Sequence, residues 1–361
     1  MRSEVDGRAV ARAPEELVPF AYDLPADLIA QEPALERADA RLMLVARGSL
    51  DPAARDAQIR DLPGLLRRGD LLVVNRSRVL AARLLGQRVP GGGESEILLV
   101  APRTEGRDAA LAVWRALGRP ARRLEAGRRL RVGEFELEIL ARDGPWLDVA
   151  FPRDVDVHAV LARYGEVPLP PYIHRDAGAT EADRVRYQTV FAREPGSVAA
   201  PTAGLHLTSE ILAELGESGV GIAEIVLHVG PATFLAALPG RTPTELEPEP
   251  YRIPAQARTA IAATQARGGR VVAVGTTTTR ALESAAAVGW PEGWQSTQLL
   301  ISPGHTFRVV AGLLTNFHLP GTSLLALVAA FAGTGCCQEA YAAAVRRRYR
   351  FYSYGDAMLI L

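Results

Sequence analysis

Lysine is absent from this sequence. All 41 basic residues are arginine, and 41 acidic residues balance them to a formal net charge of zero. Without lysine the chain cannot form a Schiff base, which excludes pyridoxal enzymes and lysine-dependent aldolases. It also lacks the G-x-x-x-x-G-K-[ST] phosphate loop of ordinary phosphate-loop nucleotidases. Every fixed positive charge is instead a planar guanidinium, which suits the binding of carboxylates and phosphates.

Cysteines and long apolar runs are also scarce. The two cysteines, Cys336 and Cys337, are adjacent, and a disulfide between neighbours would be strained. No His or Cys residues stand at the spacing of metal ligands, so we expect no metal. The longest strongly apolar run, 324–332, falls short of the roughly 20 residues that a membrane helix needs. With no apolar core near the N-terminus to form a signal peptide, we expect a cytoplasmic protein with reduced thiols and no membrane contact.

The length of 361 residues suggests about two domains. Residues 1–18 are expected to form a variable arm. Residues 67–159 hold short apolar runs between glycine turns, including the alternating run 133–139, and this pattern predicts a small antiparallel β-barrel. Strands and helices alternate along 160–361, which together with 19–66 are expected to form a layered α/β catalytic domain. The predicted fold class is therefore α/β, with the barrel inserted into the larger domain.

Polar clusters follow several predicted strands of the α/β part. Two of them lead into helices, namely the Pro-Thr-Ala-Gly turn at 201–204 and the threonine-rich segment 275–280. A helix N-terminus offers free N–H groups to an anion. Two further clusters, 314–323 and 352–358, contain histidine, asparagine, hydroxyls and tyrosines, and His228 ends another strand. The loops predict one pocket for a ligand with hydroxyl, carboxylate and flat-ring groups, but they do not define a reaction.

Longer strings in the chain resemble one known family. They are PLPPYIHR, DRVRYQTVFAREPGSVAAPTAGLHLT, LHVGPATF, GTTTTRALES, LLTNFHLPGTSLLALVAAFAG and YRFYSYGDAML, with YDLPADLIAQEP and GDLLVVNRSRVLAARLLG near the start. They resemble the S-adenosylmethionine:tRNA ribosyltransferase-isomerases of queuosine biosynthesis, in the family's order, over roughly residues 19–361. The resemblance implies an α/β domain with an inserted antiparallel β-barrel, in agreement with the pattern of apolar runs.

The resemblance also implies a reaction. Members of this family move the ribosyl part of S-adenosylmethionine onto 7-aminomethyl-7-deazaguanine at the wobble position of tRNA. The ribosyl carbons rearrange to an epoxycyclopentane, which gives epoxyqueuosine, while adenine and methionine leave. S-adenosylmethionine is therefore expected as a consumed co-substrate and tRNA as the partner, with no metal implied and the chain acting as a monomer.

The same resemblance implies roles for single residues. The sulfonium acidifies its neighbouring 5′ carbon, so a base would start the rearrangement. A histidine, with an ordinary pKa of about 6.5, suits that step. The expected catalytic residues are His206 and His318 first, then His228, with Asp356. The residues expected to bind S-adenosylmethionine are Pro201, Thr202, Ala203, Gly204, Thr276, Thr277, Arg280, Asn316 and Tyr354. The residues expected to bind the acceptor are Tyr172, Glu249, Tyr251 and Arg78.

Four departures from the family's pattern leave the acceptor open. They are EPEPY at 247–251 in place of His-Ser-Glu-x-Tyr, Thr-Thr at 278–279 in place of Ser-Val, Arg76 in place of Asp or Asn, and Gly321 in place of Lys or Glu. One alternative is a divergent member that uses S-adenosylmethionine on a free deazapurine or another small acceptor. Another is an inactive, RNA-binding relative.

Overall fold

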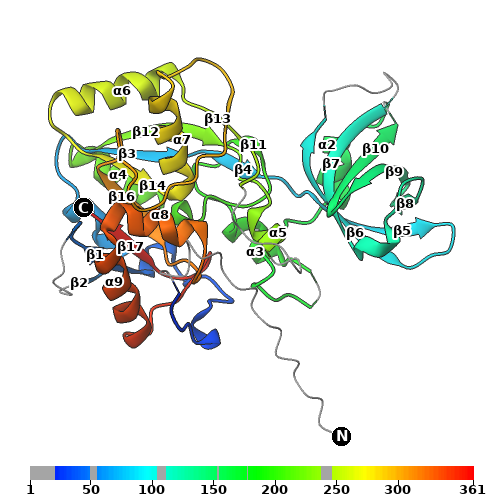
Figure 1. The fold of residues 1–361 in the computed structure, drawn as a ribbon, viewed down its shortest axis with the longest axis horizontal. Helices are drawn as coiled ribbons and strands as arrows, with labels where there is room; N and C mark the ends of the chain where they lie inside the picture. The colour runs from blue at the N-terminus through cyan, green and yellow to red at the C-terminus, as the bar shows by residue number, and fades with distance from the viewer. Residues whose placement is uncertain (1–20, 49–54, 104–110, 153, 177, 237–245) are drawn as a thin grey trace, which may run out of the picture.

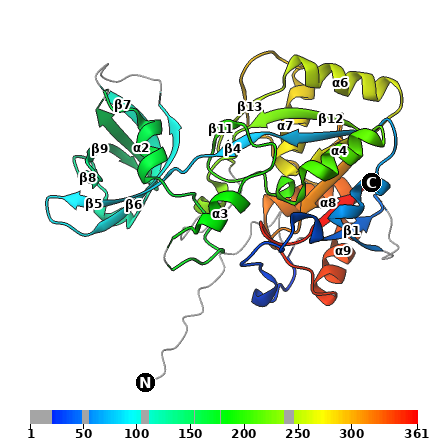
Figure 2. The ribbon, with the colours of Figure 1, turned by 180° about the vertical axis from the view of Figure 1, so that it is seen from behind.

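The computed structural model describes residues 21–48, 55–103, 111–152, 154–176, 178–236 and 246–361. It consists of a large α/β unit and a smaller β-barrel that stands to one side of it (Figures 1 and 2). The barrel is closed and antiparallel, and its strands interrupt the α/β unit in sequence, which confirms the predicted fold class. The predicted arm at 1–18 lies outside the described residues.

A sheet of nine strands forms the centre of the α/β unit. In order across the sheet the strands are β15 (Gln295–Thr297), β13 (Glu249–Arg252), β12 (Gly221–Leu227), β3 (Leu71–Asn75), β14 (Val271–Val274), β16 (Gly312–Asn316), β17 (Ala357–Ile360), β1 (Arg41–Val45) and β2 (Arg55–Gln58). Every residue of β3, β14 and β16 is buried. This burial is typical of parallel strands that are covered on both faces.

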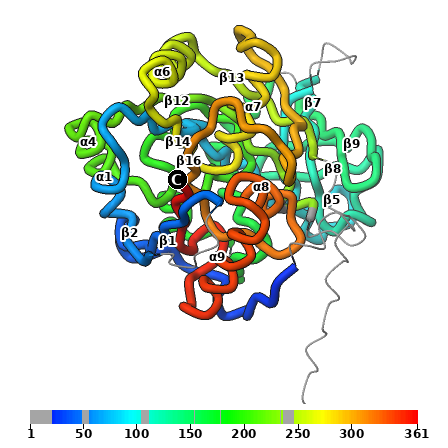
Figure 3. Tube along the Cα trace, turned by 60° about the vertical axis from the view of Figure 1, so that its left-hand side comes forward, coloured from blue at the N-terminus to red at the C-terminus, as the bar shows by residue number. Residues whose placement is uncertain are grey.

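The order and direction of the strands bring several loops to one edge of the sheet. Neighbouring strands β12, β3, β14 and β16 run parallel, so their carboxyl ends lie together. β17 runs antiparallel to β16, with Asn316 opposite Ala357, and β1 runs parallel to β17, with Leu42 opposite the same Ala357. Figure 3 shows β17, in red, close to β1, in blue. The amino ends of β17 and β1 therefore lie at this same edge, which we call the site edge.

Helices cover both faces of the sheet. The α-helices are α1 (Leu62–Leu65), α2 (Val157–Tyr164), α3 (Glu181–Arg186), α4 (Ser209–Glu217), α5 (Ala232–Ala236), α6 (Ala255–Ala266), α7 (Thr276–Ala287), α8 (Ser323–Ala332) and α9 (Thr334–Arg346). The 3₁₀ turns are η2 (Ala26–Leu28), η3 (Arg37–Asp39), η4 (Ile59–Asp61), η5 (Ala121–Arg123) and η6 (Thr202–His206). Alternate residues of β3 face opposite ways, so Leu71 and Val73 pack in one cluster with α6 to α9, while Leu72 and Val74 pack with α1 and α4.

The C-terminal helices α8 and α9 follow each other directly in the chain. No single helix in the chain's described part is long and apolar enough to cross a membrane, and these two pass that test only together, across a bend of 115°. Most side chains of α8, including Leu325, Leu327 and Phe331, are buried in the core of the α/β unit.

Six strands close the barrel in the order β10-β7-β6-β5-β8-β9. They are β5 (Arg83–Val89), β6 (Glu94–Pro102), β7 (Leu111–Arg119), β8 (Arg129–Val132), β9 (Phe135–Asp143) and β10 (Trp146–Pro152). Alternation along β9 places Leu137 and Ile139 inside the barrel, as a strand with one buried face requires.

The structure corrects the predicted start of the barrel at residue 67. Strand β3, which follows that point, lies at the centre of the nine-stranded sheet, and β4 (Ser77–Val79) pairs with β11 (Glu194–Ser197) outside the barrel. The short apolar run of β3 does not alternate, because both faces are covered, and the sequence pattern alone did not separate it from a barrel strand. The predicted end at 159 falls inside α2, whose Val157 and Leu161 join the barrel core.

The chain returns from the barrel to the α/β unit beside Gly165. Residues Arg83 and Glu166 form an antiparallel bridge at this junction, and their side chains form an ion pair. A Cβ on Gly165 would overlap the main-chain carbonyl oxygen of Ala81. Glycine is therefore required here by the close approach of two backbone segments.

Gly165→Ala is expected to lower the free energy of unfolding by about 1–3 kcal/mol, because the new methyl group must displace the backbone of Ala81. Denaturant unfolding followed by circular dichroism measures this loss. Gly216→Ala is the matched control, because a Cβ on Gly216 of α4 would meet open space and alanine favours a helix by up to about 1 kcal/mol. Equal stability of the two variants would contradict the tight junction.

Candidate functional site

The site edge gathers most of the polar clusters predicted from the sequence. Asn75, Gly275 and Asn316 end or directly follow three of its parallel strands, and His228 follows the fourth. The turn before β17 and the segment before β1 reach the same edge because of the strand directions. Ligands of open α/β sheets bind outside the carboxyl ends of the strands, so the topology itself marks this edge as the candidate site.

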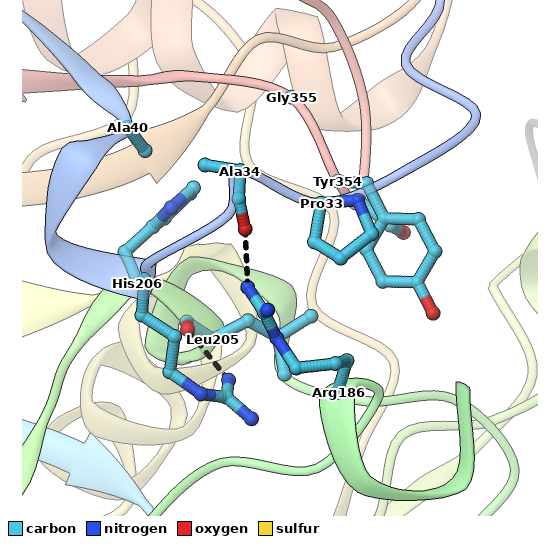
Figure 4. Close-up of a pocket in the computed structure, with 10 residues that line it drawn as sticks. Pro33, Ala34, Ala40, Arg186, Leu205, His206, Tyr354 and Gly355 are labelled. Carbon is cyan, nitrogen blue, oxygen red and sulfur yellow. Dashed lines mark hydrogen bonds between the residues drawn. The ribbon is translucent and has the colours of Figure 1, made fainter. Parts of the chain in front are cut away.

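A pocket opens at this edge where four chain segments meet (Figure 4). It holds about 270 Å³ of empty space, part of it open solvent. The lining residues are Pro33, Ala34, Arg37, Ala40, Arg186, Leu205, His206, Ser353, Tyr354 and Gly355. His206 and Tyr354 were predicted as site residues, whereas Arg37 and Arg186 were missed. The only sequence signal for Arg186 is its position inside the matching string DRVRYQTVF.

His206 is held as a neutral imidazole. Its Nε2 lies 3.1 Å from Nδ2 of Asn316, and the same Nδ2 donates to the carbonyl oxygen of Tyr352 at 3.0 Å. Because an amide nitrogen can only donate, Nε2 of His206 accepts and the proton sits on Nδ1. Burial, with Arg350 and Arg37 nearby, lowers the pKa of His206 to about 3.

Asn316 also carries an unused acceptor. Its Oδ1 is buried and has no hydrogen-bond partner among the described residues, while its Nδ2 is occupied by His206 and Tyr352. Buried amide oxygens are normally paired, so this oxygen is available to an N–H group of a ligand.

His318 is fixed through both its main chain and its ring. Its backbone N–H donates to the hydroxyl of Tyr341 at 3.1 Å, and its carbonyl oxygen accepts from the hydroxyl of Tyr22 at 2.5 Å. The ring Nε2 lies 3.0 Å from Oγ1 of Thr315. Burial lowers the pKa of His318 to about 4, so this imidazole is also neutral near pH 7. When Nε2 donates to Thr315, the lone pair of Nδ1 is free.

His228 belongs to a separate hydroxyl chain. The N–H of Val229 donates to Oγ of Ser197 at 2.9 Å, the hydroxyls of Ser197 and Ser77 are 2.6 Å apart, and Oγ of Ser77 lies 2.8 Å from Nδ1 of His228. Both serines are fully buried, so each hydroxyl hydrogen needs a hydrogen-bond acceptor. Both hydrogens find one when Ser197 donates to Ser77 and Ser77 donates to Nδ1 of His228. The proton of His228 therefore sits on Nε2, and its ring stacks on Trp294 at 5.0 Å.

The four threonines at the start of α7 fall into two pairs. Thr278 donates to the carbonyl oxygen of Val274 at 2.7 Å and Thr279 to that of Gly275 at 3.1 Å. Thr276 and Thr277 remain in the first turn, where the helix N–H groups have no partner within the helix. The predicted binding residues Thr276 and Thr277 therefore keep the donors that a ligand at this end of the helix needs.

Arg280 and Glu249 bind each other. Nη1 of Arg280 pairs with Oε2 of Glu249, both side chains are buried, and Nε of Arg280 donates to the carbonyl oxygen of Leu299 at 2.9 Å. The other carboxylate oxygen of Glu249 accepts from the N–H of Gly230 at 2.8 Å. From the sequence, Arg280 was expected to bind a ligand carboxylate and Glu249 a ligand amine. Because the two side chains pair with each other, the structure supports neither assignment.

Two further predicted residues hold the structure in place. The oxygens of Asp356 accept from the backbone N–H groups of Arg41 at 3.1 Å and Arg350 at 2.8 Å, which ties the turn before β17 to the start of β1. Tyr251 of β13 is buried in the main hydrophobic core. Neither arrangement supports the predicted catalytic role of Asp356 or the predicted acceptor contact of Tyr251.

The remaining predicted residues lie near the site edge in different settings. The hydroxyl of Tyr354 donates to Oδ1 of Asp183 at 2.9 Å. Tyr172 shares a hydrogen bond of 2.6 Å with Ser353, and its ring centre is 4.0 Å from that of Tyr352. Arg78 is exposed on β4. Both tyrosine hydroxyls are therefore engaged by neighbouring side chains.

The turn η6 places Thr202, Ala203 and Gly204 directly before His206. Its start, Pro201, is buried, and Ala203 packs close to Gly275. The turn at 201–206 therefore lies beside the start of α7.

No metal centre is evident where side chains can be placed. The described residues contain no group of three His, Cys, Asp or Glu side chains that could hold a metal ion. Both cysteines are buried free thiols, and burial raises the pKa of Cys337 to about 12.

Comparison with known proteins identifies the family. The fold and the pocket define an α/β protein with a ligand site at the carboxyl edge of its sheet and an inserted barrel. A family model described as queuosine biosynthesis protein matches residues 17–360. The chain belongs to this family, which confirms the resemblance found in the sequence.

Individual relatives agree with this assignment. A protein of Azoarcus sp. (strain BH72) is 49% identical over 344 residues, covering 94% of this chain and 96% of its own. A Thermus thermophilus protein is 48% identical over 360 residues, covering 96% and 100%. Both are named S-adenosylmethionine:tRNA ribosyltransferase-isomerase, which confirms the predicted class of enzyme. The crystal structure of an S-adenosylmethionine tRNA ribosyltransferase from Thermotoga maritima is similar, with 35% identity, a TM-score of 0.54 and coverage of 95% of this chain and 100% of that chain.

The low pKa of His206 makes the protein acid-sensitive in a defined window. The unfolded chain takes up a proton near pH 6.5, whereas folded His206 stays neutral to about pH 3, so stability falls as the pH drops below 6.5. Between pH 6.5 and pH 5 this one group lowers the free energy of unfolding by about 2 kcal/mol.

Urea unfolding at pH 7 and pH 5 is expected to show a smaller loss of unfolding free energy for His206→Gln than for the wild type. The exposed His158→Gln is expected to keep the wild-type loss, and an equal loss in His206→Gln would contradict the buried neutral imidazole.

Proposed function

We propose that the chain is an S-adenosylmethionine:tRNA ribosyltransferase-isomerase. It transfers the ribosyl part of S-adenosylmethionine to 7-aminomethyl-7-deazaguanine at the tRNA wobble position and isomerises it, which forms epoxyqueuosine and releases adenine and methionine. The observation that carries this proposal is the match over 94% of the chain, at 49% identity, to a relative with that name. S-adenosylmethionine is a consumed co-substrate in this reaction.

The geometry of the site edge supports the binding of such a donor. The turn η6 and the start of α7 lie side by side, because Ala203 packs close to Gly275. Threonine hydroxyls and unpaired helix N–H groups there suit ribose hydroxyls, and the free Oδ1 of Asn316 suits an N–H donor of the adenine or of the acceptor. Asn316 contacts His206, which lines the pocket.

The three histidines take different parts in the proposed reaction. Removal of a proton from the carbon next to the sulfonium requires a free lone pair, and His318 offers one on Nδ1 when its Nε2 donates to Thr315. Nε2 of His206 is occupied by Asn316, so its Nδ1–H acts as a hydrogen-bond donor. His228 is likewise a donor, through Nε2, because Ser77 occupies its Nδ1. We therefore assign the base to His318 and orienting roles to the other two.

Two of the four departures from the family's pattern, Arg76 and Thr278–Thr279, are accommodated by local contacts, which favours tRNA as the acceptor. The guanidinium of Arg76 pairs with Glu194 at 3.2 Å and Glu224 at 3.3 Å, so its charge is neutralised outside the pocket. The hydroxyls of Thr278 and Thr279 bond to backbone carbonyls of the preceding turn. These three substitutions change the support of the site edge and add no group to the pocket.

Incubation with S-adenosylmethionine and one of two acceptors tests the proposal. We expect adenine and methionine to be released with tRNA that carries 7-aminomethyl-7-deazaguanine and not with the free base, as measured by liquid chromatography. Release with the free base alone would show a small-molecule acceptor. Binding of tRNA without any release would show an inactive relative.

His318→Ala is expected to lower the rate of adenine release by about 10²- to 10⁴-fold, the usual contribution of a general base. His158→Ala, which lies in α2 beside the barrel, is the control and is expected to keep the wild-type rate. Circular dichroism of each variant separates a catalytic loss from a loss of fold. If folded His318→Ala keeps the full rate of adenine release, His318 is not the general base.

A further inference from the structure

Two arginines of the pocket lack a carboxylate partner. Elsewhere in the α/β unit, buried acids hold arginines, as in the pairs Asp70–Arg270, Asp183–Arg175 and Glu249–Arg280. Arg37 and Arg186 instead donate to main-chain carbonyl oxygens, and within the described part of the chain no acidic side chain forms an ion pair with either. Their positive charges are therefore not neutralised by the protein around them.

Both guanidiniums keep donors for another molecule. Arg37 donates to the carbonyl oxygens of Leu205, Val185 and Gln188 at 2.6, 3.1 and 2.9 Å. Arg186 donates to those of Leu35 and Ala34 at 2.9 and 2.6 Å. A guanidinium has five N–H donors, so two remain on Arg37 and three on Arg186. One of these, Nε of Arg186, is buried without a partner.

The surroundings of the pair add no negative charge. His206 beside them is neutral, and Tyr354 donates its hydroxyl to Asp183. Asp183 itself is held by the fork of Arg175. The pKa of Arg37 is lowered by burial and by Arg186, which shows that the two like charges lie close enough to repel. An anion between them would relieve this repulsion.

Another acid near the pair is also engaged. Asp39, two residues after Arg37 in η3, forms an ion pair with Arg60. A third guanidinium, that of Arg350, also lowers the pKa of His206, but it pairs with the buried carboxylate of Asp356 at 3.6 Å. The excess of positive charge in the pocket therefore comes from Arg37 and Arg186.

We propose that Arg37 and Arg186 form a receptor for one oxyanion, and that this oxyanion is the carboxylate of the amino-acid end of S-adenosylmethionine. The inference rests on the proposed function and adds a binding site to it. Guanidinium forks match the geometry of a carboxylate. Pro33, Ala34 and Leu205 add apolar lining beside the two arginines, which suits the methylene arm that carries this carboxylate better than a phosphodiester.

The chemistry of this receptor replaces an expectation from the sequence. Arg280 was expected to bind the donor carboxylate, but Glu249 neutralises its charge and Leu299 takes its Nε, which leaves only Nη2 without a partner among the described residues. Arg37 and Arg186 supply the same guanidinium groups from η3 and α3, and both line the pocket together with His206. The carboxylate would then be held next to the imidazole that orients the donor.

The test compares two ligands on the same protein preparations. Dissociation constants are measured by calorimetry for S-adenosylmethionine and for its decarboxylated form, which differs only in the carboxylate. We expect the wild type to bind the decarboxylated ligand about 10- to 100-fold more weakly, the size expected for hydrogen bonds to a charged group. Arg186→Gln is expected to reduce this ratio to near one, and because the ratio is taken within one preparation, incomplete folding does not change it.

Two further variants sharpen the comparison. Arg186→Lys keeps the charge but loses the fork, so an intermediate ratio is expected. Arg184→Gln on the same helix α3 is the matched control, since Arg184 is exposed and pairs with Glu181 at 3.7 Å, and it is expected to keep the wild-type ratio. Thermal unfolding by circular dichroism reports the fold of each variant.

The binding of tRNA separates the possible sources of the anion. If Arg186→Gln weakens tRNA binding and leaves the ligand ratio unchanged, the anion is a phosphate and the carboxylate assignment is overturned. A wild type that releases adenine but binds both ligands equally overturns this inference alone. A wild type that binds neither ligand overturns the proposed function and the inference with it.

Discussion

Parallel strands cannot be joined by a tight turn, and this constraint organises the molecule. Each connection between β12, β3, β14 and β16 must cross a face of the sheet, so their carboxyl ends open at one edge with room for long loops. β17 runs the other way beside β16, and it brings the turn at 352–356 to that edge. Asn316 and the turn at 352–356 lie together there because of strand direction, although they come from different parts of the sequence.

Much of this fold was predictable from the pattern of apolar residues. Alternation along 133–139 and the glycine turns around it predicted the barrel, and the alternation of strands and helices predicted the layered unit. Strand β3 was misplaced because a run that is buried on both faces has no period to show which sheet it joins. Its neighbours β12 and β14 are about 150 and 200 residues away in sequence, and only the folded chain reveals them.

The site was predictable in its residue types but not in its pairings. Asn316, His206 and His318 stand in strings that marked them in advance, and the structure joins the first two by a hydrogen bond. Which arginine serves a ligand depends on which one lacks an acid. The 41 arginines and 41 acids of the sequence do not reveal this, because partners such as Asp70 and Arg270 lie 200 residues apart. The availability of Arg37 and Arg186 is a property of the tertiary structure.

The position of β17 bears on how the protein folds. Its ladder with β1 joins Leu42 to Ala357, a loop of more than three hundred residues, and contacts of such high sequence separation form slowly because closing a long loop costs chain entropy. The barrel strands, by contrast, lie within 83–152 and pair locally. The barrel is thus able to close while the larger sheet is still open, and the pocket, which needs the turn before β17, is among the last features to form.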